Sequence, residues 1–266
     1  MPARSPLINI MVRTAQHAAR GLKRDFGEIE QLQVSRKGPA DFVSTADLRA
    51  EKQVTEDLIK ARPDYGLLSE EGSVREPRAG GPRWVIDPLD GTTNFLHGIP
   101  HFAISIGLEQ TGTLLAAVVY DPIKDELFHA EKGGGAFLND RRLRVSSRRK
   151  LEEAVLATGM PFKGHGDTTR LIEEVGRVMP EVAGIRRFGA AALDLAYVAA
   201  GRFEAFWERD LKPWDVAAGA LLVREAGGYV SAIDGRDFTL DGKSVLASNS
   251  NLHTDVSAAL AGRLKR

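Results

Sequence analysis

Residues 84–95 read WVIDPLDGTTNF, a short apolar strand followed by two carboxylates three positions apart. Pro88 fixes its own φ angle and restricts the backbone of the residue before it, so the turn after the strand is stiff. Gly91 permits a sharp bend or a close approach of the backbone to a ligand. The pattern predicts a strand-to-loop junction that holds Asp87 and Asp90 beside each other.

Two threonines follow this junction and can open a short helix. The free N–H groups and the dipole at a helix N-terminus attract anions. Asp87 and Asp90 would supply a cation site directly beside them, and metal-assisted phosphoryl transfer needs this combination. The same residue types also dominate ordinary turns, so the segment 87–91 alone does not separate a turn from a site.

Further acids stand at comparable positions elsewhere in the chain. Residues 69–72 read SEEG, which places Glu70 and Glu71 at the end of another apolar strand. Residues 212–215 read KPWD, which places Asp215 at the start of an apolar helix. These acids favour a metal site, although spacing alone makes a helix N-cap the commoner role for Asp215.

Composition narrows the classes of protein that remain. The chain has 266 residues, 36 basic against 36 acidic side chains and no cysteine. Disulfides and thiolate metal sites are therefore excluded, and a hard cation would sit on oxygen ligands. Because the net charge is zero, the chain has no overall positive field that would favour nucleic acid or an anionic membrane. Neither a signal peptide nor a membrane span is visible, so a cytoplasmic protein is expected.

The order of the expected elements predicts the fold class. Helical spacing of apolar residues over 7–26 and 45–61 precedes strands at 65–69 and 83–87. Turn signals then separate three strands of an antiparallel meander over 102–130. After residue 151 strands and helices alternate, which indicates α/β layering. The strands of that part are expected at 154–158, 185–188, 203–208, 229–232 and 244–247, and its helices at 168–179, 190–200, 214–226 and 252–264.

The prediction is an α/β protein that forms one domain, 1–266. Its N-terminal part, about residues 1–150, is α+β, and its C-terminal part, 151–266, is α/β.

Three separated motifs resemble the inositol monophosphatase family, and most closely its bacterial SuhB-like branch. They are Glu70-Glu71, DPLDGTTNF at 87–95 and WDVAAG at 214–219, in this order. GPADFVSTAD at 38–47 and AALDLAYVAAG at 191–201 extend the resemblance over nearly the whole chain. Within the lithium-sensitive phosphatase superfamily, the continuation TNF at 93–95 resembles the inositol branch.

The resemblance implies a layered αβαβα sugar-phosphatase fold, a homodimer and an enzyme that uses two to three Mg²⁺ ions. Its implied reaction is hydrolysis of a small phosphomonoester, above all inositol 1-monophosphate, by water activated at the metal. Glu70, Asp87 and the carbonyl of Leu89 would hold a first ion. Asp87, Asp90 and Asp215 would hold a second, and a third, weaker ion would sit near Glu70.

The resemblance also implies the catalytic and phosphate-binding groups. Glu70 would orient the attacking water, and Thr92, supported by Asp47, would accept or relay its proton. The N–H groups of Gly91 and Thr92 would bind phosphate oxygens.

Substrate recognition is implied for a second set of residues. Asp90 and Glu208 would accept hydrogen bonds from hydroxyl groups of the substrate, the N–H of Ala191 would donate one, and Arg186 would lie close by. The complete implied set of substrate contacts is Glu70, Leu89, Asp90, Gly91, Thr92, Arg186, Ala191, Glu208 and Asp215. A surface or interface arginine at 186 and a solvated strand end at 208 are the alternative interpretations.

One departure from the family falls beside this set. Many members carry Ser or Thr where this chain has Ala190. The missing hydroxyl puts substrate preference in doubt, but not hydrolysis.

Other candidates carry weaker signals. His97 and His101 have the spacing of a zinc pair, but no further His or Cys cluster supports zinc, so a structural or rim role is expected. Asp194, within an apolar helix, is expected to be a structural hydrogen-bonding residue.

Two competing functions remain open at this point. Another substrate of the superfamily would be fructose 1,6-bisphosphate, histidinol phosphate or a nucleotide bisphosphate. In a different class, the chain would be a protein partner of the transcription machinery with secondary phosphatase activity, as is thought of some bacterial relatives.

Overall fold

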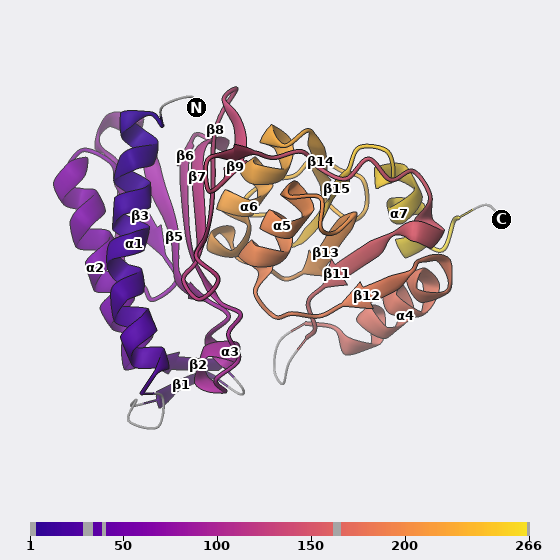
Figure 1. The fold of residues 1–266 in the computed structure, drawn as a ribbon, viewed down its shortest axis with the longest axis horizontal. Helices are drawn as coiled ribbons and strands as arrows, with labels where there is room; N and C mark the ends of the chain where they lie inside the picture. The colour runs from indigo at the N-terminus through magenta and orange to yellow at the C-terminus, as the bar shows by residue number, and fades with distance from the viewer. Residues whose placement is uncertain (1–3, 29–33, 39–40, 162–165, 265–266) are drawn as a thin grey trace.

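Five layers of secondary structure follow one another across the long axis of the molecule (Figure 1). The structure is a computed structural model, and it describes residues 4–28, 34–38, 41–161 and 166–264. Figure 1 shows a helix pair, a large sheet, a second helix pair, a smaller sheet and a third helix pair in succession. This arrangement confirms the predicted layered αβαβα fold.

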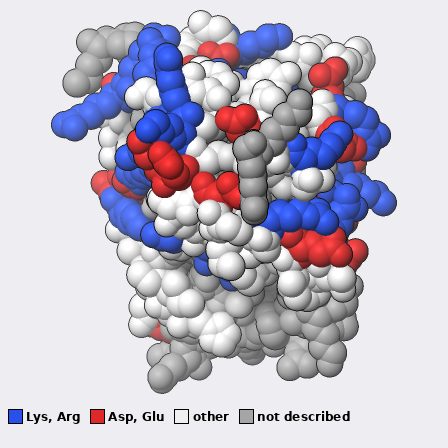
Figure 2. All heavy atoms as spheres, turned by 90° about the vertical axis from the view of Figure 1, so that its right-hand side faces the viewer, with Lys and Arg blue, Asp and Glu red and all other residues white. Residues whose placement is uncertain are grey.

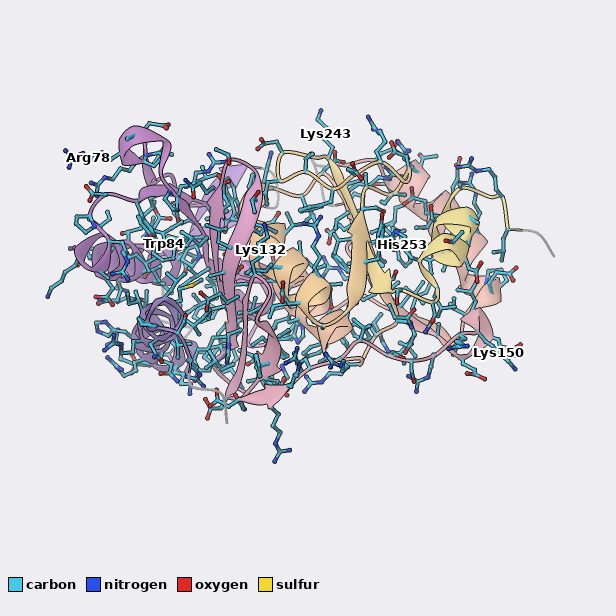
Figure 3. The ribbon with its side chains drawn as sticks, turned by 90° about the horizontal axis from the view of Figure 1, so that it is seen from above. Arg78, Trp84, Lys132, Lys150, Lys243 and His253 are labelled. Atoms are coloured by element: carbon cyan, nitrogen blue, oxygen red, sulfur yellow. The ribbon has the colours of Figure 1, made fainter. Side chains whose placement is uncertain are left out.

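The outer helix pair consists of α1 (Pro6–Phe26) and α2 (Thr45–Ala61), as the periodicity predicts. Ser5 caps α1 by accepting a hydrogen bond from the N–H of Ile8 at 3.1 Å. The apolar faces of both helices pack on the large sheet, where Trp84 is fully buried (Figure 3).

The large sheet has eight strands in the order β10-β9-β8-β7-β6-β5-β3-β4. The predicted meander is confirmed, because β6 to β10 pair antiparallel in sequence order. β3 and β5, in contrast, are parallel neighbours. Its strands are β3 (Gly66–Ser69), β4 (Val74–Arg75), β5 (Arg83–Asp90), β6 (Ala103–Gln110), β7 (Thr113–Asp121), β8 (Glu126–Glu131), β9 (Gly135–Leu138) and β10 (Arg141–Arg142).

The sequence prediction missed several short elements. A two-stranded sheet of β1 (Val34–Gly38) and β2 (Asp41–Ser44) precedes α2, and β4, β9 and β10 were not expected. Strands of two to five residues carry too few residues for alternation to stand out from a loop. Single 3₁₀ turns lie at Arg78–Gly80, Leu151–Glu153 and Met179–Glu181.

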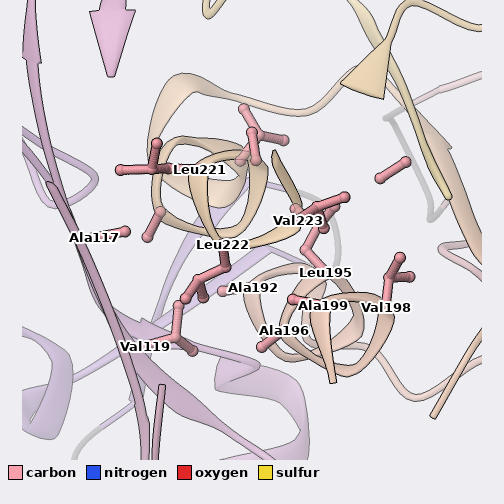
Figure 4. Packing of buried hydrophobic residues seen from close by; sticks show 14 of the residues in the cluster. Ala117, Val119, Ala192, Leu195, Ala196, Val198, Ala199, Leu221, Leu222 and Val223 are labelled. Carbon is pink, nitrogen blue, oxygen red and sulfur yellow. The ribbon is translucent and has the colours of Figure 1, made fainter. Parts of the chain in front are cut away.

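The central helix pair is α5 (Ala191–Ala199) and α6 (Pro213–Glu225). Both helices are apolar on nearly every face because sheets cover them on two sides. Figure 4 shows Leu222 of α6 next to Ala117 and Val119 of β7. This layer joins the two sheets through one continuous apolar core.

The smaller sheet has five strands in the order β12-β11-β13-β15-β14. The first three are mutually parallel, as α/β layering predicts, whereas β15 pairs antiparallel with both β13 and β14, so the sheet is mixed. The elements are β11 (Val155–Thr158), β12 (Gly184–Arg186), β13 (Ala205–Arg209), β14 (Gly228–Ser231), β15 (Ser244–Asn249), α4 (Thr168–Val178) and α7 (His253–Leu260).

Charge is mixed over the end of the molecule that carries α4 and α7. Figure 2 shows Lys and Arg side chains beside Asp and Glu side chains over this face. Among the described residues, no helix has the length and apolar character to cross a membrane.

Candidate functional site

The carboxyl ends of the parallel strands in both sheets meet at one place. Glu70 follows β3, Asp90 ends β5, and Glu208 lies near the end of β13. Parallel strands direct their carboxyl ends to the same sheet edge, where α/β proteins commonly bind ligands. Predicted site residues that are far apart in the sequence are therefore brought to one region.

The end of β5 departs from regular strand geometry. Asp87 faces Ser105 of β6 and Asp90 faces Ala103, so three steps along β5 match two steps along β6. This irregularity is a β-bulge, a device that redirects side chains beside active sites. Pro88 fits there, since a residue without an N–H is tolerated at a bulge.

Gly91 links the bulge to the short helix α3 (Thr92–Leu96) and confirms the helix that the two threonines predict. Its φ of 95° lies in the left-handed region, and a Cβ would come within 3.1 Å of the carbonyl oxygen of His101. Any other residue would be strained at this turn.

Three predicted metal ligands accept hydrogen bonds from backbone N–H groups. Asp87 accepts from Leu89 at 2.9 Å, Asp90 from Ala192 at 2.8 Å and Asp215 from Lys212 at 2.7 Å. Asp215 is not the N-cap of α6, which is Lys212, but it caps the first turn from the third helical position. These contacts fix the carboxylates in place.

As they stand, no three His, Cys, Asp or Glu side chains in the described part of the chain have the geometry of a complete metal site. The metal assignment therefore stays a prediction.

Electrostatics show that the acids interact strongly. Burial raises the pKa of Asp87 well above its usual value, and the charges of Glu70, Asp90 and Asp215 raise it further. Burial also raises the pKa values of Asp90 and Asp215 to about 7. Like charges so close destabilise one another until a proton or a cation neutralises them.

A second polar contact joins α3 to α2. The Thr92 hydroxyl lies 3.0 Å from Oδ1 of Asp47 and 3.1 Å from the carbonyl oxygen of Leu89. Asp47 also accepts hydrogen bonds from the N–H and the hydroxyl of Ser44. Burial raises the pKa of Asp47, although hydrogen bonds from Ser44 oppose the shift. The predicted Thr92–Asp47 pair is thus in hydrogen-bond contact.

Glu51 supports the Glu70 turn and was missed by sequence reasoning. Its buried carboxylate accepts from the Ser69 hydroxyl at 2.6 Å and from the Glu71 N–H at 2.9 Å. A further contact reaches the Ser73 N–H at 3.1 Å. The sequence feature that could have revealed Glu51 is its position as an acid on the apolar face of α2.

A hollow of about 390 Å³ lies at the convergence of the strand ends, lined in part by Glu70, Glu208 and Asp215. A Cβ on Gly159 would overlap the Glu208 carboxylate at 1.8 Å, so a larger residue there would displace this carboxylate. Burial, followed by the charges of Asp215, Asp194 and Asp90, raises the pKa of Glu208 well above its usual value. Glu208 is thus part of the acidic cluster.

The arginine that acts on this cluster is Arg187, which the sequence prediction did not select. Its charge lowers the pKa values of Glu208 and Asp194 against the larger effect of burial. Arg186 is exposed on β12, and its guanidinium donates to the carbonyl of Ile185 at 3.1 Å. The role of Arg186 toward substrate stays a prediction.

Ala190, which stands where the hydroxyl is missing, is the N-cap of α5 and supplies no side-chain cap. The Asp90 carboxylate accepts from the N–H of Ala192 in the first turn of the same helix. Ala191, the predicted substrate contact, is the first residue of this helix.

Asn94 is another contact that the sequence did not reveal. Its amide donates to the carbonyls of His101 and Phe188, each at 2.8 Å. It therefore ties α3 to the loop before α5, across about ninety residues of sequence. A buried amide has no recognisable spacing pattern.

The histidines do not form a pair. His101 lies 5.1 Å from the Phe188 ring, and burial lowers its pKa to about 4. His97 is exposed and terminates α3. Asp194 is buried, and its Oδ1 makes no hydrogen bond among the described residues, which differs from the expected hydrogen-bonding role.

Acids at convergent strand ends beside a short helix are the arrangement that metal-assisted phosphoryl transfer requires. Residues 3–265 match the family model described as the inositol monophosphatase family. The chain belongs to the inositol monophosphatase family.

Two curated relatives illustrate the similarity. The chain is 57% identical to an inositol-1-monophosphatase of Rhizobium meliloti over 94% of each chain. It is 45% identical to the Nus factor SuhB of Pseudomonas aeruginosa, over 98% of this chain and 99% of that protein.

The similarity extends to solved structures. The extragenic suppressor protein SuhB of Bartonella henselae superposes with a TM-score of 0.93 at 54% identity, and the match covers 96% of this chain and 98% of that one. The resemblance to the SuhB-like branch is therefore confirmed.

Proposed function

We propose that this protein is a Mg²⁺-dependent phosphatase that hydrolyses a small phosphomonoester, with inositol 1-monophosphate as the leading substrate. The single observation that carries the proposal is the convergence of four acids, seen in the charges of Glu70, Asp90 and Asp215 that act on the buried Asp87. The name of the Rhizobium relative supports the same activity and the same substrate.

The donor set suits Mg²⁺. Glu70, Asp87 and the Leu89 carbonyl would hold a first ion, and Asp87, Asp90 and Asp215 a second, with a third near Glu70. All of these groups are hard oxygen donors. Burial first, and neighbouring carboxylates second, raise the pKa values of Asp87, Asp90 and Asp215, and a cation would offset both effects. When bound, Mg²⁺ would supply an activated water and neutralise phosphate charge.

The other steps belong to side chains and N–H groups of this chain. Glu70 orients the water, and the Thr92 hydroxyl accepts or relays its proton with Asp47 as the hydrogen-bond partner. The N–H groups of Gly91 and Thr92 bind phosphate oxygens, because α3 leaves its first N–H groups without helical partners.

Recognition of the leaving group would use the acidic hollow. Asp90 and Glu208 accept from hydroxyl groups of the substrate, the N–H of Ala191 donates, and Arg186 lies near the alcohol. The remaining substrate contacts are Glu70, Leu89, Gly91, Thr92 and Asp215. We further propose one domain, 1–266, that works as a homodimer in the cytoplasm.

A phosphate-release assay tests the function. The substrates are inositol 1-monophosphate, fructose 1,6-bisphosphate, histidinol phosphate and a nucleotide bisphosphate, each with and without Mg²⁺. We expect release to require Mg²⁺ and to be fastest for inositol 1-monophosphate. If another substrate is faster by about a hundredfold, the substrate assignment is wrong. If none reacts, the phosphatase proposal fails.

A second candidate function is binding to the transcription machinery, because the Pseudomonas relative is named a Nus factor. Capture of transcription proteins from lysate by the wild type and by Asp90→Asn tests it. Equal capture with lost phosphatase activity would show that both functions coexist and are separable. No capture by either protein would exclude the second function.

A further inference from the structure

A second hollow, of about 510 Å³, lies between α1 and α2. It occupies the half of the helix pair formed by residues 17–25 of α1 and residues 46–56 of α2. That half includes the start of α2, close to β2 and α3 in Figure 1. None of the residues assigned to the phosphatase site lines it.

The lining of this hollow is basic. Arg20 and Arg24 come from α1, and Arg49 and Lys52 from α2, against the two acids Asp25 and Glu56. Because the whole chain has zero net charge, this excess of cations is local. Cations stand on both walls, so an anion inside would face positive charge from two sides.

A buried acid organises two of these cations. Asp25 is 5% exposed, and its carboxylate lies 3.2 Å from Arg24 and 2.9 Å from Arg49, so it joins the two helices. A guanidinium has five N–H donors, and both arginines are more than half exposed. Donors therefore remain for a ligand, and the planar arginine fork matches the oxygens of a phosphate group.

The space above Gly21 is open. A Cβ at this position would meet no atom within 4 Å, although Gly21 lies inside a helix and lines the hollow. Glycine in a helix interior costs roughly 1 kcal/mol relative to alanine, so packing gives no reason for it here. Its effect is to keep the hollow free of side-chain atoms.

The hollow adjoins the phosphatase site through the first turn of α2. Ala46 lines the hollow, and the next residue, Asp47, contacts Thr92. Arg49 also donates to the carbonyl of Thr45 at 3.1 Å. A ligand that engages Arg49 would therefore act on the turn that carries Asp47.

We propose that the α1–α2 hollow is a binding site for a small molecule with two or more phosphate groups, and that its occupancy stabilises the first turn of α2. The binding part is independent of the proposed phosphatase activity. The effect on catalysis through Asp47 rests on that proposed function.

Calorimetric titration with inorganic pyrophosphate in metal-free buffer tests the binding part. The variants below leave the acidic cluster unchanged, so a loss of binding in them reports on this hollow and not on the phosphatase site. The wild type is expected to bind, and Arg20→Gln combined with Lys52→Gln to weaken binding by about tenfold or more. Gly21→Leu should abolish binding by filling the space, and circular dichroism would confirm that it folds.

Lys60→Gln is the matched control, since Lys60 is an exposed cation on α2 outside the hollow. It is expected to bind as the wild type does. The proposal is overturned if the wild type does not bind, if the double variant or Gly21→Leu binds equally well, or if the control loses as much affinity as the double variant.

Hydrogen exchange of residues 46–50 tests the effect on α2 in the same buffer. Saturation with pyrophosphate should slow exchange of these amides in the wild type but not in Gly21→Leu. Unchanged exchange in a wild type that binds the probe would overturn this part. Since neither experiment measures turnover, an inactive enzyme would contradict the proposed phosphatase function without affecting the binding site.

Discussion

The two hollows of this protein carry opposite charges. The hollow at the strand ends gathers Glu70, Glu208 and Asp215 from three separate elements. The hollow between α1 and α2 gathers cations from two neighbouring helices. A chain with equal numbers of acids and bases therefore holds two local fields, and its net charge predicts neither of them.

The difference also concerns how each charge is stabilised. The acids lie at strand ends and in a helical first turn, where burial raises their pKa values. The cations project from exposed helix surfaces and pair in part with a buried aspartate. The buried acids are thus neutralised by a proton or a cation, whereas the exposed cations keep their charge in contact with water. The first turn of α2 lies between them.

The largest expected effect comes from removing one carboxylate from the acidic cluster. Asp90→Asn removes a charge from the cluster, while the amide oxygen can still accept the Ala192 N–H. Phosphatase turnover should fall by at least about a hundredfold, because one of the proposed metal ligands is lost. The assay is phosphate release at saturating Mg²⁺.

Asp64→Asn is the control for this prediction, since Asp64 is an exposed acid paired only with Arg78 across 3.4 Å among the contacts of the described residues. Its turnover should match the wild type. Near-normal turnover of Asp90→Asn would contradict the metal assignment.

A somewhat smaller effect is expected at the boundary between the hollows. Thr92→Val removes the hydroxyl that contacts Asp47 but keeps the size of the side chain. Loss of a proton relay should lower kcat by about a hundredfold with little change in KM. Thr92→Ser retains the hydroxyl and should retain most activity. Equal losses in both variants would show that packing matters rather than the proton.

The pH dependence of stability tests whether the acids of the cluster hold protons in the folded state. Asp90 has a pKa of about 7 when folded but its usual value of 3.8 when unfolded, so between these values only the folded state holds the proton. Unfolding free energy in metal-free buffer should therefore fall as pH rises from about 4 to 7, by about 1 kcal/mol per pH unit for this group. Urea unfolding at several pH values measures the slope.

Asp90→Asn and added Mg²⁺ should each reduce that slope. The asparagine does not titrate, and a bound cation would stabilise the ionised carboxylate. A slope equal to that of the wild type in the variant would show that other groups cause it.

The smallest expected effect comes from alanine substitutions at two helical glycines. One glycine lines the open basic hollow, and the other lies in the densely packed central core. Gly21→Ala should raise the unfolding free energy by roughly 1 kcal/mol, because its Cβ meets no atom within 4 Å. Gly219→Ala in α6 should lower it, since its Cβ would lie 2.4 Å from the Cβ of Leu195. Urea midpoints measure both. If both variants are stabilised, the residues packed around Gly219 can move to accept a methyl group, and the predicted overpacking is wrong.

The sequence determined the longest elements and the key motif. Apolar periodicity located α1 and α2 closely, and the residues 84–95 predicted a strand and a short helix that are both present. The turn expected after Asp87 is instead a bulge within β5, which continues to Asp90. These features depend on local chemistry: helical spacing, the fixed φ of proline and the conformational range of glycine. Resemblance then supplied the family, which the relatives confirm.

Only the tertiary structure decided which side chains meet. Glu51 and Arg187 act on the site from elements distant in the sequence, and Asn94, although it lies in the quoted motif, bonds to a carbonyl about ninety residues away. None of the three roles was predicted. The α1–α2 hollow likewise depends on how two helices pack. Periodicity and turn chemistry describe neighbours along the chain, whereas burial, pKa shifts and contacts depend on neighbours in space, which five packed layers bring together.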